Sequence, residues 1–180
     1  IVDDDKNLCE SLEMILNEVG YGALSVYNGK DALQAAQEHE FDAAIIDIRL
    51  PDIDGVEVLR QLNQMDTNMG IMMVSGEATV ETAVGSLNQG ADAFLLKPVN
   101  AKDLINRLKR ITRLKAAQRE IERQRLLLDD LYENAPVMYL SVDTKGIVRS
   151  INKTMADTLG FSKDTILDGH ISQLRATEPS

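Results

Sequence analysis

The chain has 180 residues, 44% of them hydrophobic and 27% charged, and a formal net charge of −10 at pH 7. This composition is typical of a globular protein with room for one full domain and part of a second. No apolar stretch approaches the roughly 18 residues of a transmembrane helix, and the single cysteine excludes an intrachain disulfide, so we expect a reduced, cytoplasmic setting without membrane insertion.

Five short apolar runs alternate with amphipathic segments over the first 110 residues. The runs cover residues 1–2, 23–26, 43–46, 71–74 and 93–96, and they are apolar on both faces, as buried parallel strands are. Between them, the three- and four-residue spacing of apolar side chains predicts helices at 7–19, 29–38, 55–65 and 79–89. This alternation predicts an α/β domain with a five-stranded parallel sheet covered on both faces. Because the first run is already under way at Ile1, we expect residues to precede it.

A long helix follows, since neither Gly nor Pro interrupts residues 101–133. A first apolar stripe (Leu104, Leu108 and Ile111) is predicted to pack on the sheet. A second stripe over residues 114–131 follows heptad spacing and predicts a coiled coil with a second copy of the chain, after a local change of register. The alternative is a helix docked on its own domain. The stripe consists of Leu114, Ala117, Ile121, Gln124, Leu128 and Leu131.

The remaining segment, 134–180, has a different pattern. Residues 137–152 predict two strands joined by a turn at 143–146, and two short helical pieces follow. These few elements are not enough to enclose a complete hydrophobic core. We therefore expect this second domain to be cut short.

Charge is distributed unevenly along the chain. Residues 1–100 carry 18 acidic and 5 basic side chains, which argues against nucleic-acid binding by the first domain. The basic run "RLKRITRLKAAQR" could serve a DNA-binding regulator, but its heptad spacing favours a solvated coiled-coil face. We therefore expect no nucleic-acid partner.

Polar residues follow several of the predicted strands. Asp3, Asp4 and Asp5 follow the first, and Asp47, Ser75 and Lys97 follow the third, fourth and fifth in turn. The carboxyl ends of parallel strands meet at one edge of a sheet, so these side chains should converge there.

Clustered carboxylates repel one another and need a cation. All-oxygen ligands with room for water and phosphate favour Mg²⁺, and no His/Cys cluster suggests zinc. A carboxylate beside Mg²⁺ and an ammonium group can act as a nucleophile toward phosphorus. The sequence therefore predicts phosphoryl transfer to Asp47, with Lys97 neutralising the transferred group and Ser75 donating a hydrogen bond to it.

Four motifs follow one another along the chain: "IVDDD", "IIDIRLPDIDG", "MMVSGEA" and "FLLKPV". In this order and spacing they make residues 1–112 resemble the receiver domain of two-component response regulators. The resemblance implies a flavodoxin-like fold, Asp47 as phosphoacceptor and Asp3 and Asp4 as Mg²⁺-binding acids. It also implies the backbone carbonyl of Arg49 as a further ligand, Ser75 and Phe94 as switch residues, and a cis peptide between Lys97 and Pro98. Asp5 is an acid beyond the two that the family requires. The phosphodonor would be a histidine kinase or a phosphotransfer protein.

Residues 134–180 begin with "Asn-Ala-Pro", continue with the strand–turn–strand pattern and contain "LGF" before "ILDG". These features resemble the start of a PAS domain. Residues 113–133 would then be a coiled-coil signalling helix. This order suggests a phosphoacceptor module in a dimeric signalling protein, in which a PAS domain and a further output domain receive the signal. The whole protein could be a hybrid sensor histidine kinase or a cyclic-dinucleotide enzyme. An aspartyl-phosphate phosphatase is a competing class, but it needs an acid–base group two residues past the nucleophile, where this chain has Arg49.

Overall fold

The computed structural model describes residues 1–65, 68–77, 80–160 and 162–174. The chain divides into two compact units, Ile1–Arg119 and Glu120–Ser180. Among the described residues, none of the helices is both long and apolar enough to cross a membrane.

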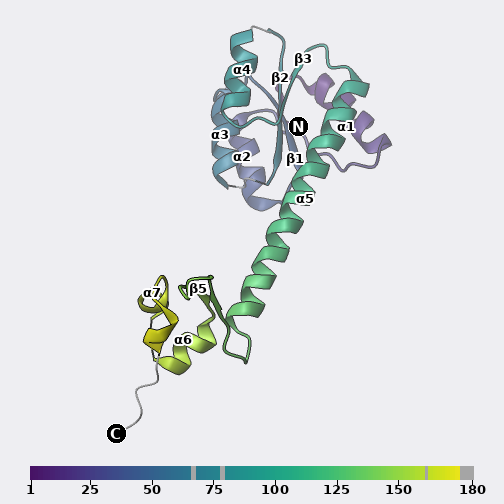
Figure 1. Cartoon of the computed structure of the whole chain (residues 1–180). Helices are drawn as coiled ribbons and strands as arrows, with labels where there is room; N and C mark the ends of the chain where they lie inside the picture. The colour runs from purple at the N-terminus through teal and green to yellow at the C-terminus, as the bar shows by residue number, and fades with distance from the viewer. Residues whose placement is uncertain (66–67, 78–79, 161, 175–180) are drawn as a thin grey trace. The chain divides into compact units, whose positions relative to one another are not determined.

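Unit 1 is an α/β domain built on a parallel sheet (Figure 1). Its three named strands lie in the order β1-β2-β3, with Ile45 opposite Met72 and Met73 opposite Phe94. The predicted helices are present, although Thr79, where the fourth was predicted to begin, lies outside the described residues. In chain order the elements are α1 Lys6–Glu18, α2 Gly29–Glu38, β1 Ala43–Asp47, α3 Gly55–Met65, β2 Gly70–Ser75, α4 Val80–Asn88, β3 Ala93–Leu96 and α5 Ala101–Glu133.

The prediction of five strands was wrong in number, because the first two runs form isolated bridges and not ladders. Val2 bridges to Val26 on one side and to Ile46 on the other, both in parallel. Val26 donates through its amide to Ile1 O at 2.9 Å and accepts, through its carbonyl, from Asp3 N at 3.2 Å. The bridges nevertheless place these segments beside β1, with Val2 N donating to Ile45 O at 2.8 Å.

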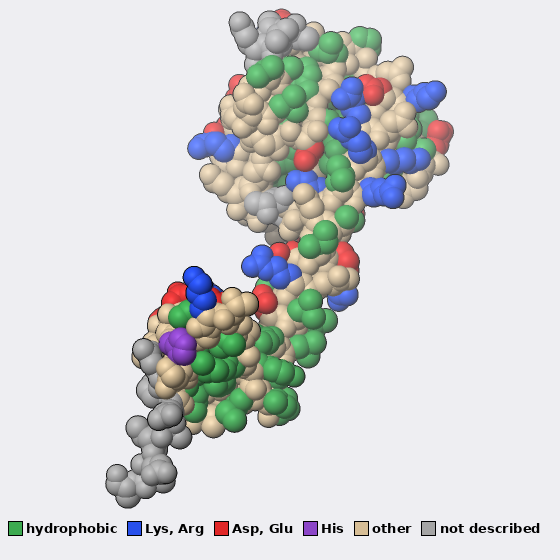
Figure 2. Space-filling model, in the orientation of Figure 1, with side chains coloured by type: hydrophobic (Ala, Val, Ile, Leu, Met, Phe, Trp, Pro, Cys, Tyr) green, Lys and Arg blue, Asp and Glu red, His purple; other side chains and the backbone are tan. Residues whose placement is uncertain are grey.

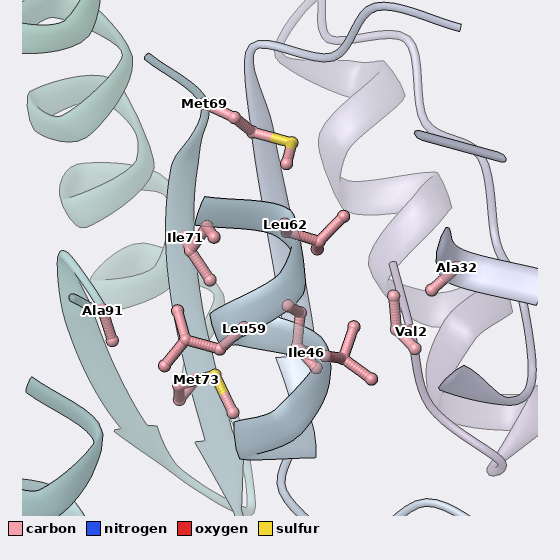
Figure 3. Close-up of a cluster of buried hydrophobic side chains, with 10 residues drawn as sticks. Val2, Ala32, Ile46, Leu59, Leu62, Met69, Ile71, Met73 and Ala91 are labelled. Carbon is pink, nitrogen blue, oxygen red and sulfur yellow. The ribbon is translucent and has the colours of Figure 1, made fainter. Parts of the chain in front are cut away.

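Helices cover both faces of the sheet (Figure 1). One face packs against α2 and α3 through a cluster that contains Ile46, Ile71 and Met73 (Figure 3). The other face packs Ile45 and Met72 against α1 and α5. Neighbouring residues of one strand thus enter opposite cores, as the period of two requires, and this explains why the runs are apolar without alternation.

Helix α5 spans the predicted 101–133, and its first stripe is buried against the sheet as expected. The buried side of the helix continues past Ile111 in steps of four. Lys115 Nζ lies 3.5 Å from Asp92 Oδ1, and Arg119 Nη1 lies 3.0 Å from Asp42 Oδ1. Because Asp42 and Asp92 directly precede β1 and β3, α5 is anchored at the edge of the sheet opposite Asp47.

The second stripe lies on a different side of α5, and its leucines and Ile121 are more than half exposed. In unit 2, hydrophobic side chains gather on the surface of the helix (Figure 2).

Unit 2 contains the predicted antiparallel hairpin, in which Ser141 lies opposite Ser150. The fully buried Asn152 links the hairpin to the end of α5 and to α6. Its Nδ2 donates to Tyr132 O and Val137 O. Its Oδ1 accepts from Tyr139 N and Met155 N. A small core forms around Val148, Ile151, Ala156 and Ile166. Phe161, within the first predicted helical piece, lies outside the described residues. The elements after α5 are β4 Leu140–Val142, β5 Val148–Ile151, α6 Lys153–Leu159, α7 Lys163–Ile166 and a 3₁₀ helix, η1, Ile171–Leu174.

Candidate functional site

Three carboxylates meet at the edge of the sheet where the strands end. Asp3 follows Val2 and Asp47 is the last residue of β1, so the parallel pairing of these segments brings both to the same edge. Asp3 and Asp47 are buried, with 3% and 6% of their surface exposed, while Asp4 is exposed. One carboxylate oxygen from each of Asp3, Asp4 and Asp47 lies within 4.8 Å of the others.

Lys97 closes this acidic pocket. It directly follows β3, and its Nζ lies 2.7 Å from Asp3 Oδ2 and 2.6 Å from Asp47 Oδ2. Partial burial by itself lowers the pKa of Lys97, but the hydrogen bonds and charges of Asp3 and Asp47 outweigh it, so the pKa is raised. The side chain is therefore a charged ammonium at neutral pH. The peptide bond between Lys97 and Pro98 is cis, as the resemblance implied.

Asp5 does not share this pocket through its side chain. Its carboxylate caps α1 by accepting from the amides of Asn7 and Leu8, at 3.0 and 3.1 Å. Its own amide donates to Asp3 Oδ1 at 3.0 Å, which orients the first acid. Burial raises the pKa of the Cys9 thiol, which stays protonated and donates to the carbonyl of Asp3 at 3.4 Å.

Arg49 and Ser75 both contact Glu77, in the loop after β2. The Arg49 amide lies 3.4 Å from Asp47 Oδ1, so its backbone borders the site, while its exposed side chain pairs with Glu77. The buried Ser75 Oγ donates to Glu77 O at 2.8 Å and accepts from Glu77 N at 3.1 Å. Both of these hydrogen bonds are with the backbone of the loop that Ser75 begins.

Phe94 lies on β3 and is half-buried. Its ring packs against the cluster beneath α3, and its backbone pairs with Met73 of β2. It therefore sits two strands away from Asp47, with β2 between them.

The carboxylates fit a magnesium site. All three offer hard oxygen donors, which Mg²⁺ prefers, and Asp4 is open to solvent, which suits a metal that keeps several waters. The charge balance supports the same conclusion, because three acids face one ammonium and a divalent cation would offset the excess.

Two side-chain contacts near this site were not predicted from the sequence. Glu77 pairs with Arg49, and Asp52 accepts hydrogen bonds from the amides of Gly29 and Lys30 at the start of α2. The only local signal for Asp52 is its place after Pro51, where acidic residues commonly stabilise turns.

Curated proteins with similar sequences are bacterial regulators. The chain is 35% identical over 113 residues to the transcriptional regulatory protein PrrA of Mycobacterium tuberculosis, which covers 63% of this chain and 48% of PrrA. It is 30% identical over 159 residues to the response regulator ArlR of Staphylococcus aureus, which covers 88% of this chain and 69% of ArlR. The chain thus spans about half the length of PrrA.

Solved structures show the same fold. A CheY-like response regulator receiver domain protein from Methanospirillum hungatei superposes with a TM-score of 0.63 at 35% identity, over 65% of this chain and 94% of that one. The family model of the response regulator receiver domain matches residues 1–109. The acidic cluster is also of the kind that holds Mg²⁺ in a receiver. The chain therefore belongs to the response regulator receiver domain family, the phosphoacceptor modules of two-component signalling.

Proposed function

We propose that Asp47 accepts a phosphoryl group from a histidine kinase or phosphotransfer protein, in the cytoplasm and with Mg²⁺ bound by Asp3, Asp4, Asp47 and the carbonyl of Arg49. The observation that carries this proposal is the convergence of Asp47 with two further acids and an ammonium at the strand ends. Mg²⁺ would supply positive charge to the phosphoryl oxygens.

In the transfer, a bond forms between a carboxylate oxygen of Asp47 and phosphorus, while the phosphorus–nitrogen bond of the donor phosphohistidine breaks. The leaving imidazole nitrogen takes a proton. Lys97 Nζ already lies 2.6 Å from Asp47 Oδ2 and can pair with a phosphoryl oxygen once that carboxylate becomes an acyl phosphate. A phosphatase activity is disfavoured because an arginine guanidinium cannot be deprotonated in proteins, so Arg49 cannot serve as an acid–base group, and because its side chain pairs with Glu77.

The switch would begin at Ser75. Its hydroxyl, now bonded to the backbone of Glu77, would turn to the phosphoryl group, and Phe94 would move into the space left beside β2. Because Phe94 is only half-buried, its ring has room to change position. The altered face would include α4, β3 and the start of α5.

The output would run through α5. The stripe at 114–131 is exposed, and we assign it to a parallel helix pair with a second copy of the chain. Residues 134–180 would be the first part of a PAS domain and would pass the change to an output domain, as in a hybrid sensor histidine kinase. DNA binding by the basic run is less favoured, since Arg107, Lys115 and Arg119 of that run are already in ion pairs.

The test is intact-mass analysis after incubation with acetyl phosphate, with and without Mg²⁺. Wild-type protein should gain one phosphoryl group only with Mg²⁺, and Asp47→Asn should gain none. The matched control, Asp31→Asn, removes an exposed acid of α2 and should label normally. Labelling of Asp47→Asn would refute the assignment.

A further inference from the structure

The loop between β1 and α3, residues 48–54, borders the phosphoacceptor. At its base the Gly55 amide donates to Ile48 O at 2.8 Å. A Cβ on Gly55 would lie 2.0 Å from the carbonyl oxygen of Asp47, so the loop returns in direct contact with the backbone of the acceptor. The position of this loop sets where the peptide group of Arg49 stands relative to the Asp47 carboxylate.

Asp52 links this loop to the start of α2, which lies more than twenty residues earlier in the chain. Its Oδ1 accepts from Gly29 N at 2.8 Å and its Oδ2 from Lys30 N at 2.9 Å. The next amide, of Asp31, donates to the side chain of Asn28 at 2.9 Å. The first three amides of α2 are therefore satisfied, two of them by a residue more than twenty positions further along the chain.

An apolar contact accompanies this fork of two hydrogen bonds. A Cβ on Gly29 would lie 2.3 Å from Cγ1 of Ile53, so Gly29 leaves the space that the Ile53 side chain fills. Desolvation alone would raise the pKa of Asp52, but its hydrogen bonds from the amides of Gly29 and Lys30 hold the pKa below its usual range. The carboxylate is therefore ionised at neutral pH, and the positive end of the helix dipole also favours it there.

We propose that Asp52 is a positioning residue of the phosphoacceptor site: by fixing residues 48–54 on the start of α2, it keeps the Arg49 peptide group beside Asp47 before Mg²⁺ binds. This inference rests on the proposed function, because it assumes that the pocket binds Mg²⁺. Without the fork, metal binding must also order the loop, which weakens affinity. At saturating Mg²⁺ the loop is ordered again, so the phosphorylation rate recovers.

A cap that only stabilises α2 would behave differently. Its loss would lower the stability of the fold but would not change Mg²⁺ affinity in the protein that remains folded. A second alternative is that the negative charge of Asp52 attracts Mg²⁺ at long range, without any effect on the loop. Asp31 provides the matched control for this effect, since it lies in the first turn of α2 beside the amides that Asp52 binds and carries the same charge, while its carboxylate accepts a hydrogen bond from Asn28.

The experiment measures Mg²⁺ affinity of the unphosphorylated protein by calorimetry, together with acetyl phosphate labelling at limiting and saturating Mg²⁺. Asp52→Ala should raise the Kd for Mg²⁺ by roughly 10-fold, as loss of a residue that orients a metal ligand does. Its labelling should be slow at limiting Mg²⁺ and close to wild type at saturation. Asp31→Asn should keep the wild-type Kd.

An unchanged Kd in Asp52→Ala, or an equal rise in Asp31→Asn, would overturn the proposal. If Asp52→Ala does not fold, Asp52→Asn decides, because it keeps one oxygen for an amide: an intermediate Kd supports the proposal and a wild-type Kd overturns it. Absence of Mg²⁺ binding and labelling in wild-type protein would instead refute the proposed function itself.

Discussion

The Nζ of Lys97 lies 2.6 Å from Oδ2 of Asp47, a residue 50 positions earlier in the chain. Both are largely enclosed, with 24% of the side-chain surface of Lys97 and 8% of that of Asp47 exposed. Asp3 contacts the same ammonium at 2.7 Å. One cation therefore pairs with two buried acids from adjacent parallel segments of the chain.

Replacing Lys97 with Met should destabilise the metal-free protein and impair phosphorylation. Two buried carboxylates would lose their counter-charge, and removing one partner of a buried pair costs about 3 kcal/mol. Mg²⁺ should restore part of this loss because it binds the same acids in the folded state. Urea unfolding with and without Mg²⁺ measures both effects.

The exposed Lys102 on α5 gives the matched control for this experiment. Lys102→Met should unfold like wild type under both conditions. Equal stability of Lys97→Met and wild type without metal would contradict the role of this ammonium.

Two glycines should respond to alanine in opposite directions. At Gly55 the new Cβ would lie 2.0 Å from the carbonyl oxygen of Asp47, and this overlap should cost about 3 kcal/mol and slow labelling of Asp47. At Gly85, inside α4, a Cβ meets nothing within 4 Å, so alanine should stabilise by about 0.5–1 kcal/mol. Thermal unfolding of both variants checks this, and a neutral Gly55→Ala would refute the close approach.

The ion pairs of Lys115 and Arg119 should fix α5 to unit 1 beyond Ile111. Neutralising both with Met should speed amide exchange over residues 112–119, with a stability loss of about 1 kcal/mol, since partly exposed pairs contribute little. Arg113→Met, on an exposed position of the same helix, is the control. Unchanged exchange in the double variant would show that the two pairs do not anchor the helix.

The turn of the hairpin in unit 2 should be sensitive to acid. The amide of Ile147, and then the side chain of Arg149, keep the pKa of Asp143 low against the effect of desolvation. Because the folded pKa lies below the unfolded value of about 3.9, this stabilisation is present above pH ~4 and is lost as pH falls through the folded pKa. The amide shifts of Lys145 and Ile147 should therefore change only in this acidic range.

Asp143→Asn should remove this dependence, whereas Asp157→Asn, on an exposed position of α6, should keep it. A hairpin that loosens between pH 5 and 8 would contradict the assignment.

Local patterns predicted much of this domain. The bounds of α2 and α3 agree with the amphipathic segments because helical periodicity depends on neighbours within one turn. Asp47, Ser75 and Lys97 could be placed at one edge because parallel strands all end there. The two stripes of α5 and the change of register between them were predicted, but the continuation of the buried side through Lys115 and Arg119 was not, since polar side chains leave no mark in an apolar pattern.

Tertiary contacts account for the rest of what was missed. Asp52 reaches Gly29 across 23 positions and Arg49 reaches Glu77 across 28, so no periodic signal reveals either contact. The hydrogen bonds of the Ser75 hydroxyl with Glu77 were not foreseen either, because they depend on the local path of the loop after β2.

The most direct test of the account is to locate the phosphorylated atom. Borohydride reduction converts an aspartyl phosphate to homoserine, and peptide sequencing by mass spectrometry then gives its position. After treatment with acetyl phosphate and Mg²⁺, homoserine should appear at position 47 alone, and it should be absent without Mg²⁺. Homoserine at Asp3, Asp4 or any other acid, with Asp47 unmodified, would contradict the central claim.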